Sequence, residues 1–270
     1  MIPLTIIFGA IVGFSLGLTG GGGAIFAVPL LAYGLGVDSR AAIGVSLVTV
    51  GLTSFVGFLQ RWRVGLVEIR TGLVFALAGM LTAPVGSWLA TQIPEPMLLT
   101  LFAVLMLVIA VRMWRKANDP AERLVLIVNA NEPGPTCRRD AQGVLRLTSR
   151  CAMLLAGVGM ATGILTGLFG VGGGFIIVPA LVTFSGMGIQ RAIGTSLLVV
   201  SLVSVSGTVS LLALGRPLPL ETVAIFAVGS LAGLALGTAL ASRLGGPTLQ
   251  KLFVVAILIV AVFVIVKNVT

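Results

Sequence analysis

"LTGGGGAIFAVPLL" (18–31) places four consecutive glycines inside an otherwise apolar segment of the chain. Glycine has no Cβ and adopts positive φ at little cost, so such a run predicts a break in a helix. As one helix with a rise of about 1.5 Å per residue, residues 2–36 would be roughly 50 Å long, which is too long for one crossing of a bilayer core of about 30 Å. The chain is therefore expected either to bend back as a hairpin or to break and tilt.

The composition indicates that the bilayer is the solvent of this chain. Of its 270 residues, 57% are hydrophobic and 9% are charged, and the mean hydropathy is +1.16. Segments such as 101–111 and 252–266 are apolar on every side, unlike the alternating strands of a membrane barrel. We therefore predict an all-α polytopic membrane protein, whose length allows about eight to ten crossings.

The sequence contains two related halves. A shift of 150 residues places "GFSLGLTGGGGAIFAVPLL" (13–31) over "GILTGLFGVGGGFIIVPAL" (163–181) without a gap, and "AIGVSL" (42–47) over "AIGTSL" (192–197). A shift of 151 then matches 85–90 to 236–241. We predict two homologous transmembrane repeats, 1–114 and 149–270, joined by a polar cytoplasmic linker, 115–148.

Each repeat is expected to hold a glycine-broken helix or hairpin followed by three transmembrane helices. The predicted segments are 2–18 with 24–36, 41–60, 65–90 and 97–114, then 151–168 with 175–187, 191–214, 219–242 and 249–267.

The basic residues predict the orientation of the halves. Nearly half of the 17 Lys and Arg residues lie between Arg112 and Arg150, which favours a cytoplasmic linker over nucleic-acid binding as the reason for the formal charge of +9. Corresponding loops carry opposite basic bias: 61–70 is richer than its partner, whereas 91–96 is poorer than 242–251. The pattern favours inverted repeats with both termini outside, and parallel repeats are the alternative.

Metal and disulfide chemistry are not expected. The chain has no histidine and two cysteines, Cys137 and Cys151, so a Cys/His metal site is excluded. If both cysteines face the cytoplasm, a disulfide is not expected either.

The two glycine breaks are the candidate substrate site. Unwound backbone at membrane depth is tolerated where it lines a cavity or is buried in protein, and matched breaks in two repeats indicate a site near the midplane. Helices begin after Gly23 and Gly174, so their free N–H groups face the breaks and suit an anion. Gly22 and Gly173 are expected to hold the positive φ of this unwound backbone.

Hydroxyl groups near the breaks are expected to donate hydrogen bonds to the same anion. The predicted substrate-binding residues are Thr19, Gly20, Gly21, Gly22, Gly23, Ser46, Thr49, Gly170, Gly172, Gly173, Gly174, Thr195 and Ser196. The alternative for each hydroxyl is a bond to its own helix backbone. Glycines spaced by four residues, such as Gly9, Gly13 and Gly17, are instead predicted to let helices pack closely.

Arg40 and Arg191 precede the "AIG" motifs at nearly matched positions. We assign them to a gate or vestibule, with interfacial anchoring as the alternative.

With these motifs in place, both halves resemble the TauE/SafE family of sulfite exporters. The second half fits the family pattern through Gly170, Gly172, Gly173, Gly174, Pro179 and residues 192–197, whereas the first half departs from it at Ala24 and Val45. The resemblance implies transport of sulfite, thiosulfate, an organosulfonate or a related sulfur oxyanion.

The expected function is a secondary transporter, with an anion channel or a carrier of a different small organic anion as alternatives. The sequence has no histidine and no pair of carboxylates within the apolar segments, so an enzyme is not expected. It also lacks a nucleotide-binding motif, so ATP is not expected to drive transport, and no cofactor is expected. The expected partners are a small anionic substrate and the lipid bilayer, with no nucleic acid. A homodimer is left open. The expected location is the bacterial cytoplasmic (inner) membrane, as a multi-pass protein.

Overall fold

The computed structural model describes residues 2–118, 138–139, 145–146, 149–215 and 218–241. The elements of the first half are α1 (Ile2–Thr19), η1 (Gly22–Phe26), α2 (Ala27–Pro29), η2 (Leu30–Gly34), α3 (Ser39–Arg63), α4 (Ile69–Gln92) and α5 (Glu95–Asn118). Those of the second half are α7 (Ser149–Phe169), α8 (Gly174–Ser185), α9 (Ile189–Ala213) and α10 (Leu220–Ala241). Between the halves, β1 (Arg138–Arg139) and β2 (Leu145–Arg146) form a short antiparallel pair.

The predicted class, an all-α polytopic membrane protein, is confirmed. Among the described residues, six helices are long and apolar enough to cross a membrane: α1, α3, α4, α9, α10 and residues Cys151–Phe169 of α7. The observed helices start and end within a few residues of the predicted segments. The last predicted segment, 249–267, lies outside the described residues.

Helix α4 shows how such a segment meets lipid. Leu77, Leu81 and Val85 follow one another at spacings of four residues and are 59%, 79% and 53% exposed. Residues four apart lie on one face of a helix, so these side chains form an apolar stripe that would be unstable in water. α3 is the most extensively buried of the six candidate spans.

The first glycine break is a hairpin. After α1 the chain turns at Gly20 and Gly21, and residues 22–34 return along α1. A Cβ added to Gly23 would meet the backbone of Val12 and Leu16, and one added to Gly34 would meet the ring of Phe8. Of the two arrangements left open by the sequence, the chain adopts the bent one.

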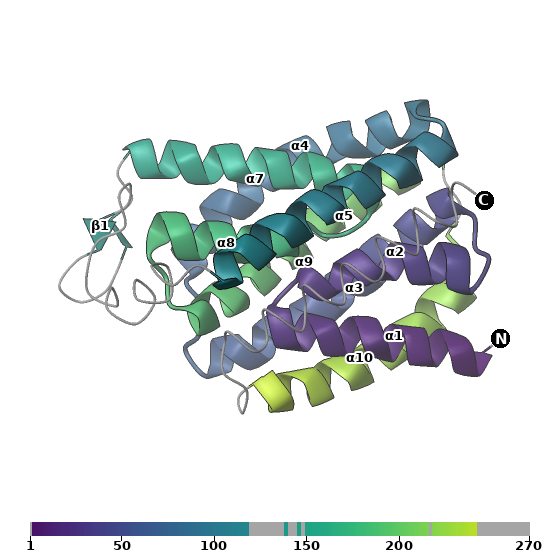
Figure 1. Cartoon of the computed structure of the whole chain (residues 1–270), viewed down its shortest axis with the longest axis horizontal. Helices are drawn as coiled ribbons and strands as arrows, with labels where there is room; N and C mark the ends of the chain where they lie inside the picture. The colour runs from purple at the N-terminus through teal and green to yellow at the C-terminus, as the bar shows by residue number, and fades with distance from the viewer. Residues whose placement is uncertain (1, 119–137, 140–144, 147–148, 216–217, 242–270) are drawn as a thin grey trace.

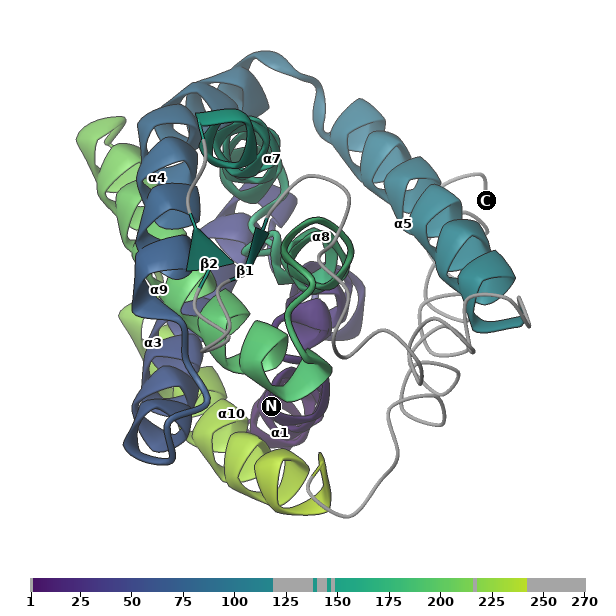
Figure 2. The same cartoon turned by 90° about the vertical axis from the view of Figure 1, so that its left-hand side faces the viewer.

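The two halves exchange partners across the molecule (Figure 1). α1 packs against α10 of the other half, and α7 packs against α4, while α3 packs against α9. The shifts of 150 and 151 residues convert the first pair into the second and return the third pair to itself. Figure 2 shows α8 inside a ring made by α7, α4, α9, α10 and α1, with α5 on the remaining side.

Glycines make the closest of these contacts, as predicted. Gly9, Gly13 and Gly17 of α1 face the backbone of α10 at 226–238. In the same way Gly159, Gly163 and Gly167 of α7 face the backbone of α4 at 75–87. Both series rise together along their two helices, so each pair of helices runs parallel.

The central pair runs antiparallel. Gly51 of α3 lies against Ser204 of α9, and Gly57 lies against Leu197. Figure 1 accordingly shows α1, α3 and α10 running from right to left and α4, α7 and α9 from left to right. Helices that correspond under the repeat therefore point in opposite directions within the bundle. How the halves face the two sides of a membrane stays a prediction.

One cysteine departs from expectation. Cys151, at the start of α7, is buried and disulfide-bonded. Reduced thiols were expected because the linker was placed in the cytoplasm, and the sequence gives no distance between the two cysteines. The other cysteine of the chain, Cys137, lies outside the described residues.

Replacing Gly13 by valine should destabilise the protein, because its side chain would enter the backbone of Ser230. Overpacking of this kind costs about 1–3 kcal/mol, and the apparent melting temperature in detergent should fall by several degrees. The matched control is Gly157→Val, since a Cβ on the exposed Gly157 of α7 meets nothing within 4 Å. Equal melting temperatures for the two variants would contradict this account of helix packing.

Candidate functional site

The two glycine turns meet at the boundary between the halves. A Cβ on Gly21 would lie 2.6 Å from the Cα of Gly174, which leaves room for backbone only. Residues 20–29 and 170–174 are all buried. The sequence prediction that the matched breaks belong to one place in the molecule is therefore met by their geometry, although their role in binding stays a prediction.

Positive φ is found at Gly20 and Gly21 in the first turn and at Gly170, Gly172 and Gly173 in the second. The expectation for Gly173 is confirmed, since its φ is +61°.

For Gly22 the expectation of positive φ is wrong. Gly22 begins η1, a short 3₁₀ segment, because the chain completes its reversal one residue earlier. Gly23 also lies in η1 and packs against α1 rather than toward the other turn.

Two serines hold the turns reciprocally. The hydroxyl of Ser46 on α3 donates to the carbonyl oxygen of Gly170 at 2.6 Å, and the hydroxyl of Ser196 on α9 donates to that of Gly20. Ser196 also has the carbonyl oxygen of Ile193 in its own helix as an acceptor, at 2.8 Å. The two serines correspond in the repeat, so each half supplies a donor to the turn of the other half. Both lie two turns inside their helices.

The other predicted hydroxyls have different partners. Thr19 donates to the carbonyl oxygen of Ser15 at 2.7 Å, and Thr49 donates to that of Val45 at 2.7 Å, so both bond to their own helix backbone. Thr195 accepts a hydrogen bond from the backbone N–H of Glu68 at 3.0 Å. Thr195 donates its own hydroxyl proton to the sulfur of Met187 at 3.6 Å. In this conformation, then, none of the three turns its hydroxyl proton toward the glycine turns.

Ser54 and Ser204 were missed by the sequence analysis. Each is fully buried, and neither hydroxyl has a hydrogen-bond partner. A buried hydroxyl without a partner costs about 1–3 kcal/mol, so a matched pair in the central helices is a candidate for ligand contact. A Cβ on Gly172 would lie 3.7 Å from the hydroxyl oxygen of Ser204. The signal was available, since the shift of 150 aligns the two serines.

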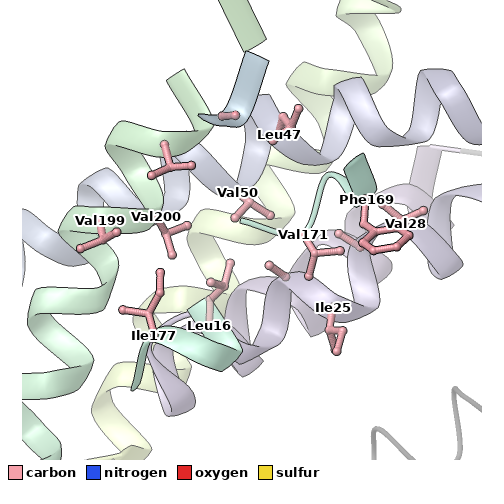
Figure 3. Close-up of a cluster of buried hydrophobic side chains, with 14 of the residues drawn as sticks. Leu16, Ile25, Val28, Leu47, Val50, Phe169, Val171, Ile177, Val199 and Val200 are labelled. Atoms are coloured by element: carbon pink, nitrogen blue, oxygen red, sulfur yellow. The ribbon is translucent and has the colours of Figure 1, made fainter. Parts of the chain in front are cut away.

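Apolar side chains from both halves enclose the turns (Figure 3). The figure labels Leu16, Ile25 and Val50 from the first half and Val171, Ile177 and Val200 from the second. Each of these six side chains is buried. The centre of the molecule is thus closed in this conformation.

Arg40 and Arg191 lie at opposite ends of the molecule, because α3 and α9 begin at opposite ends. The guanidinium of Arg40 donates to the carbonyl oxygens of Thr91 and Ile93, at 3.5 and 3.4 Å. These carbonyls end α4, where a cation is favoured by the helix dipole. Arg191 is exposed. The pair does not form one vestibule, and its gating role stays a prediction.

Comparisons with known proteins agree on a membrane transporter. A family model described as "Sulfite exporter TauE/SafE" matches residues 5–264. A "Probable membrane transporter protein" of Xylella fastidiosa is 37% identical over 97% of this chain and 94% of its own length. Similarly named proteins of Methanocaldococcus jannaschii and Haemophilus influenzae are 26% and 25% identical, over 78% and 98% of this chain and 73% and 98% of their own lengths. No solved structure matches the chain.

Replacing Ser46 or Ser196 by alanine should destabilise the closed centre, because a buried turn carbonyl then loses its donor from the other half. We expect a loss of about 1–3 kcal/mol for each, seen as a lower apparent melting temperature in detergent. Ser201→Ala is the control, since the buried Ser201 bonds only to the Leu198 carbonyl of its own helix at 2.8 Å. If all three variants melt alike, the serines do not hold the turns.

Proposed function

Because the chain belongs to the sulfite exporter TauE/SafE family, we propose that it is a secondary transporter that exports a small sulfur-containing anion, such as sulfite, thiosulfate or an organosulfonate. That it is a multi-pass membrane transporter and not an enzyme follows from the family and from the names of its relatives. The substrate, the direction and the bacterial cytoplasmic membrane as its location are the proposal.

The contact between the two glycine turns carries this proposal. η1 and α8 both begin there, and the first N–H groups of a helix have no partner within it. These donors and the positive ends of the helix dipoles favour an anion. The acidic residues of the described chain, Asp38, Glu68, Glu95 and Glu221, precede or begin helices, so none lies in mid-span to attract a cation.

The substrate is proposed to pass where the halves separate. When the turns part, the hydroxyls of Ser46 and Ser196 are freed from the carbonyl oxygens to which they now donate. Ser54 and Ser204, whose hydroxyls have no partner, lie on the same two central helices. Four neutral donors suit a carrier, because they bind an oxyanion and release it again. The closed centre favours a carrier over an anion channel, which remains the second candidate.

Purified protein in proteoliposomes should exchange labelled sulfite or thiosulfate against the same unlabelled anion, with no movement of labelled sodium. Gly21→Ala should abolish this counterflow, because its side chain enters the backbone of Gly174. Gly36→Ala is matched to it, since Gly36 also has positive φ but open space around it, and should exchange normally.

Exchange of sodium without any anion would refute the proposed substrate class. Unitary conductance in a planar bilayer would favour the channel.

The proposed inverted topology has its own test. Val64 and Leu214 correspond in the repeat, follow α3 and α9 respectively, and are 70% and 43% exposed. In cells whose protein carries serine at both native cysteine positions, a membrane-impermeant maleimide should label Leu214→Cys and spare Val64→Cys. Labelling of both residues, or of neither, would favour parallel repeats.

A further inference from the structure

Arg61 lies at the floor of a recess at one end of the molecule. The cavity has a volume of about 200 Å³ and is lined by Gln60, Arg61, Val64, Leu66, Gln190 and Thr238. Arg61 is only 5% exposed, whereas Gln60, Val64 and Gln190 are exposed. The recess therefore opens at the surface of the protein, with a buried cation at its floor. The lining comes from α3, α9 and α10 and from the residues that follow α3.

The charge of Arg61 is not compensated. Its guanidinium donates to the side-chain oxygen of Gln190 at 3.1 Å and to the carbonyl oxygen of Gly17 at 3.2 Å, and both acceptors are neutral. Its Nε is buried without a hydrogen-bond partner. Within the described chain no carboxylate pairs with it. A buried cation with neutral acceptors only is costly, and an anion in the recess would remove that cost.

We propose that this recess binds a small oxyanion through the guanidinium of Arg61. A planar guanidinium presents its N–H groups as a fork to two oxygens of one ligand, and two of its five N–H donors are used by Gln190 and Gly17. This leaves three for the ligand. The volume admits a tetrahedral or pyramidal oxyanion and excludes a large organic one. Thr238 of α10 also lines the recess.

The site has no copy in the other half. Under the shift of 150 residues, Leu211 corresponds to Arg61 and Arg40 corresponds to Gln190. Leu211 is a buried apolar residue, and Arg40 is bonded to the end of α4. The oxyanion site therefore belongs to one end of the molecule, which gives a pseudo-symmetric protein a distinguishable pair of faces.

That end is also where the linker joins the bundle. α7 begins there, directly after β2, and α3 ends there (Figure 1). Three exposed arginines, Arg63, Arg70 and Arg191, lie at the same end and raise the local concentration of anions. Glu68 is the acidic residue described at this end, and its carboxylate accepts a hydrogen bond from Thr71.

The site is suited to capture of the substrate before export. Arg61 bonds to Gly17, which lies in the last turn of α1, just before the turn at Gly20 and Gly21. An anion that draws the guanidinium into the recess would loosen this bond and so act on the glycine turn. This assignment rests on the proposed function in taking the bound oxyanion to be the one exported.

Isothermal titration of the purified full-length chain with sodium sulfite, sodium thiosulfate and sodium sulfate tests the site directly. We expect at least one of these anions to bind, and Arg61→Leu to weaken that binding about tenfold or more. Gln190→Glu should weaken it equally, because its carboxylate would pair with Arg61 in place of the anion. It introduces a favourable ion pair, so it also serves if Arg61→Leu does not fold. Gln92→Glu makes the same change at an exposed position at the end of α4, on the opposite end of the molecule, and should bind as the parent does.

Unchanged affinity in the folded Arg61 or Gln190 variants, or no binding of any of the three anions to the parent chain, would overturn the site. Counterflow separates this result from the proposed function. If exchange of sulfite or thiosulfate persists although binding does not depend on Arg61, the transporter proposal stands and the recess is not its entry site. If Arg61-dependent binding occurs without any exchange, the recess stands and the transporter proposal falls.

Discussion

Backbone-to-backbone contact through glycine is the constraint on which this structure depends. In a bilayer, apolar side chains gain little by leaving lipid for a neighbouring helix, so helices associate through close packing and hydrogen bonds. The glycines of α1 and α7 allow that packing along whole helices, and the glycines of the two turns allow it at one point in the centre. A single added Cβ at Gly13 or Gly21 would meet backbone atoms that have nowhere to move.

The exchange of partners makes the halves interdependent. α1 packs closely against α10, and α7 packs closely against α4. The first helix of each half therefore needs a helix of the other half to pack against. The same reciprocity reaches the centre, where the serine of each half holds the glycine turn of the other. A movement that parts the two turns would break both serine bonds. Such a concerted step is what a carrier with one central site requires.

Charge breaks the pseudo-symmetry of the two halves. Within the described residues, α1, α3 and α4 correspond to α7, α9 and α10, and Ser46 corresponds to Ser196. Arg61, however, has a leucine as its counterpart, and most of the described basic residues lie at the linker end. The buried arginine in its recess has a buried leucine, Leu211, at the matched position of the other half.

The sequence alone determined the class of protein, the duplication and the places where helices break, because these depend on local hydropathy, on segment length and on glycine. Its prediction of close helix packing at Gly13 was also right. Only the tertiary structure decided that the first break is a hairpin, that Gly22 lies beyond the reversal, and that Ser46 and Ser196 bond to the opposite turns. Arg61 was interpreted as a loop cation, since the predicted helix ended at residue 60. Its burial follows from contacts with Gly17 and Gln190, 44 and 129 residues away, and no local pattern encodes contacts over such separations.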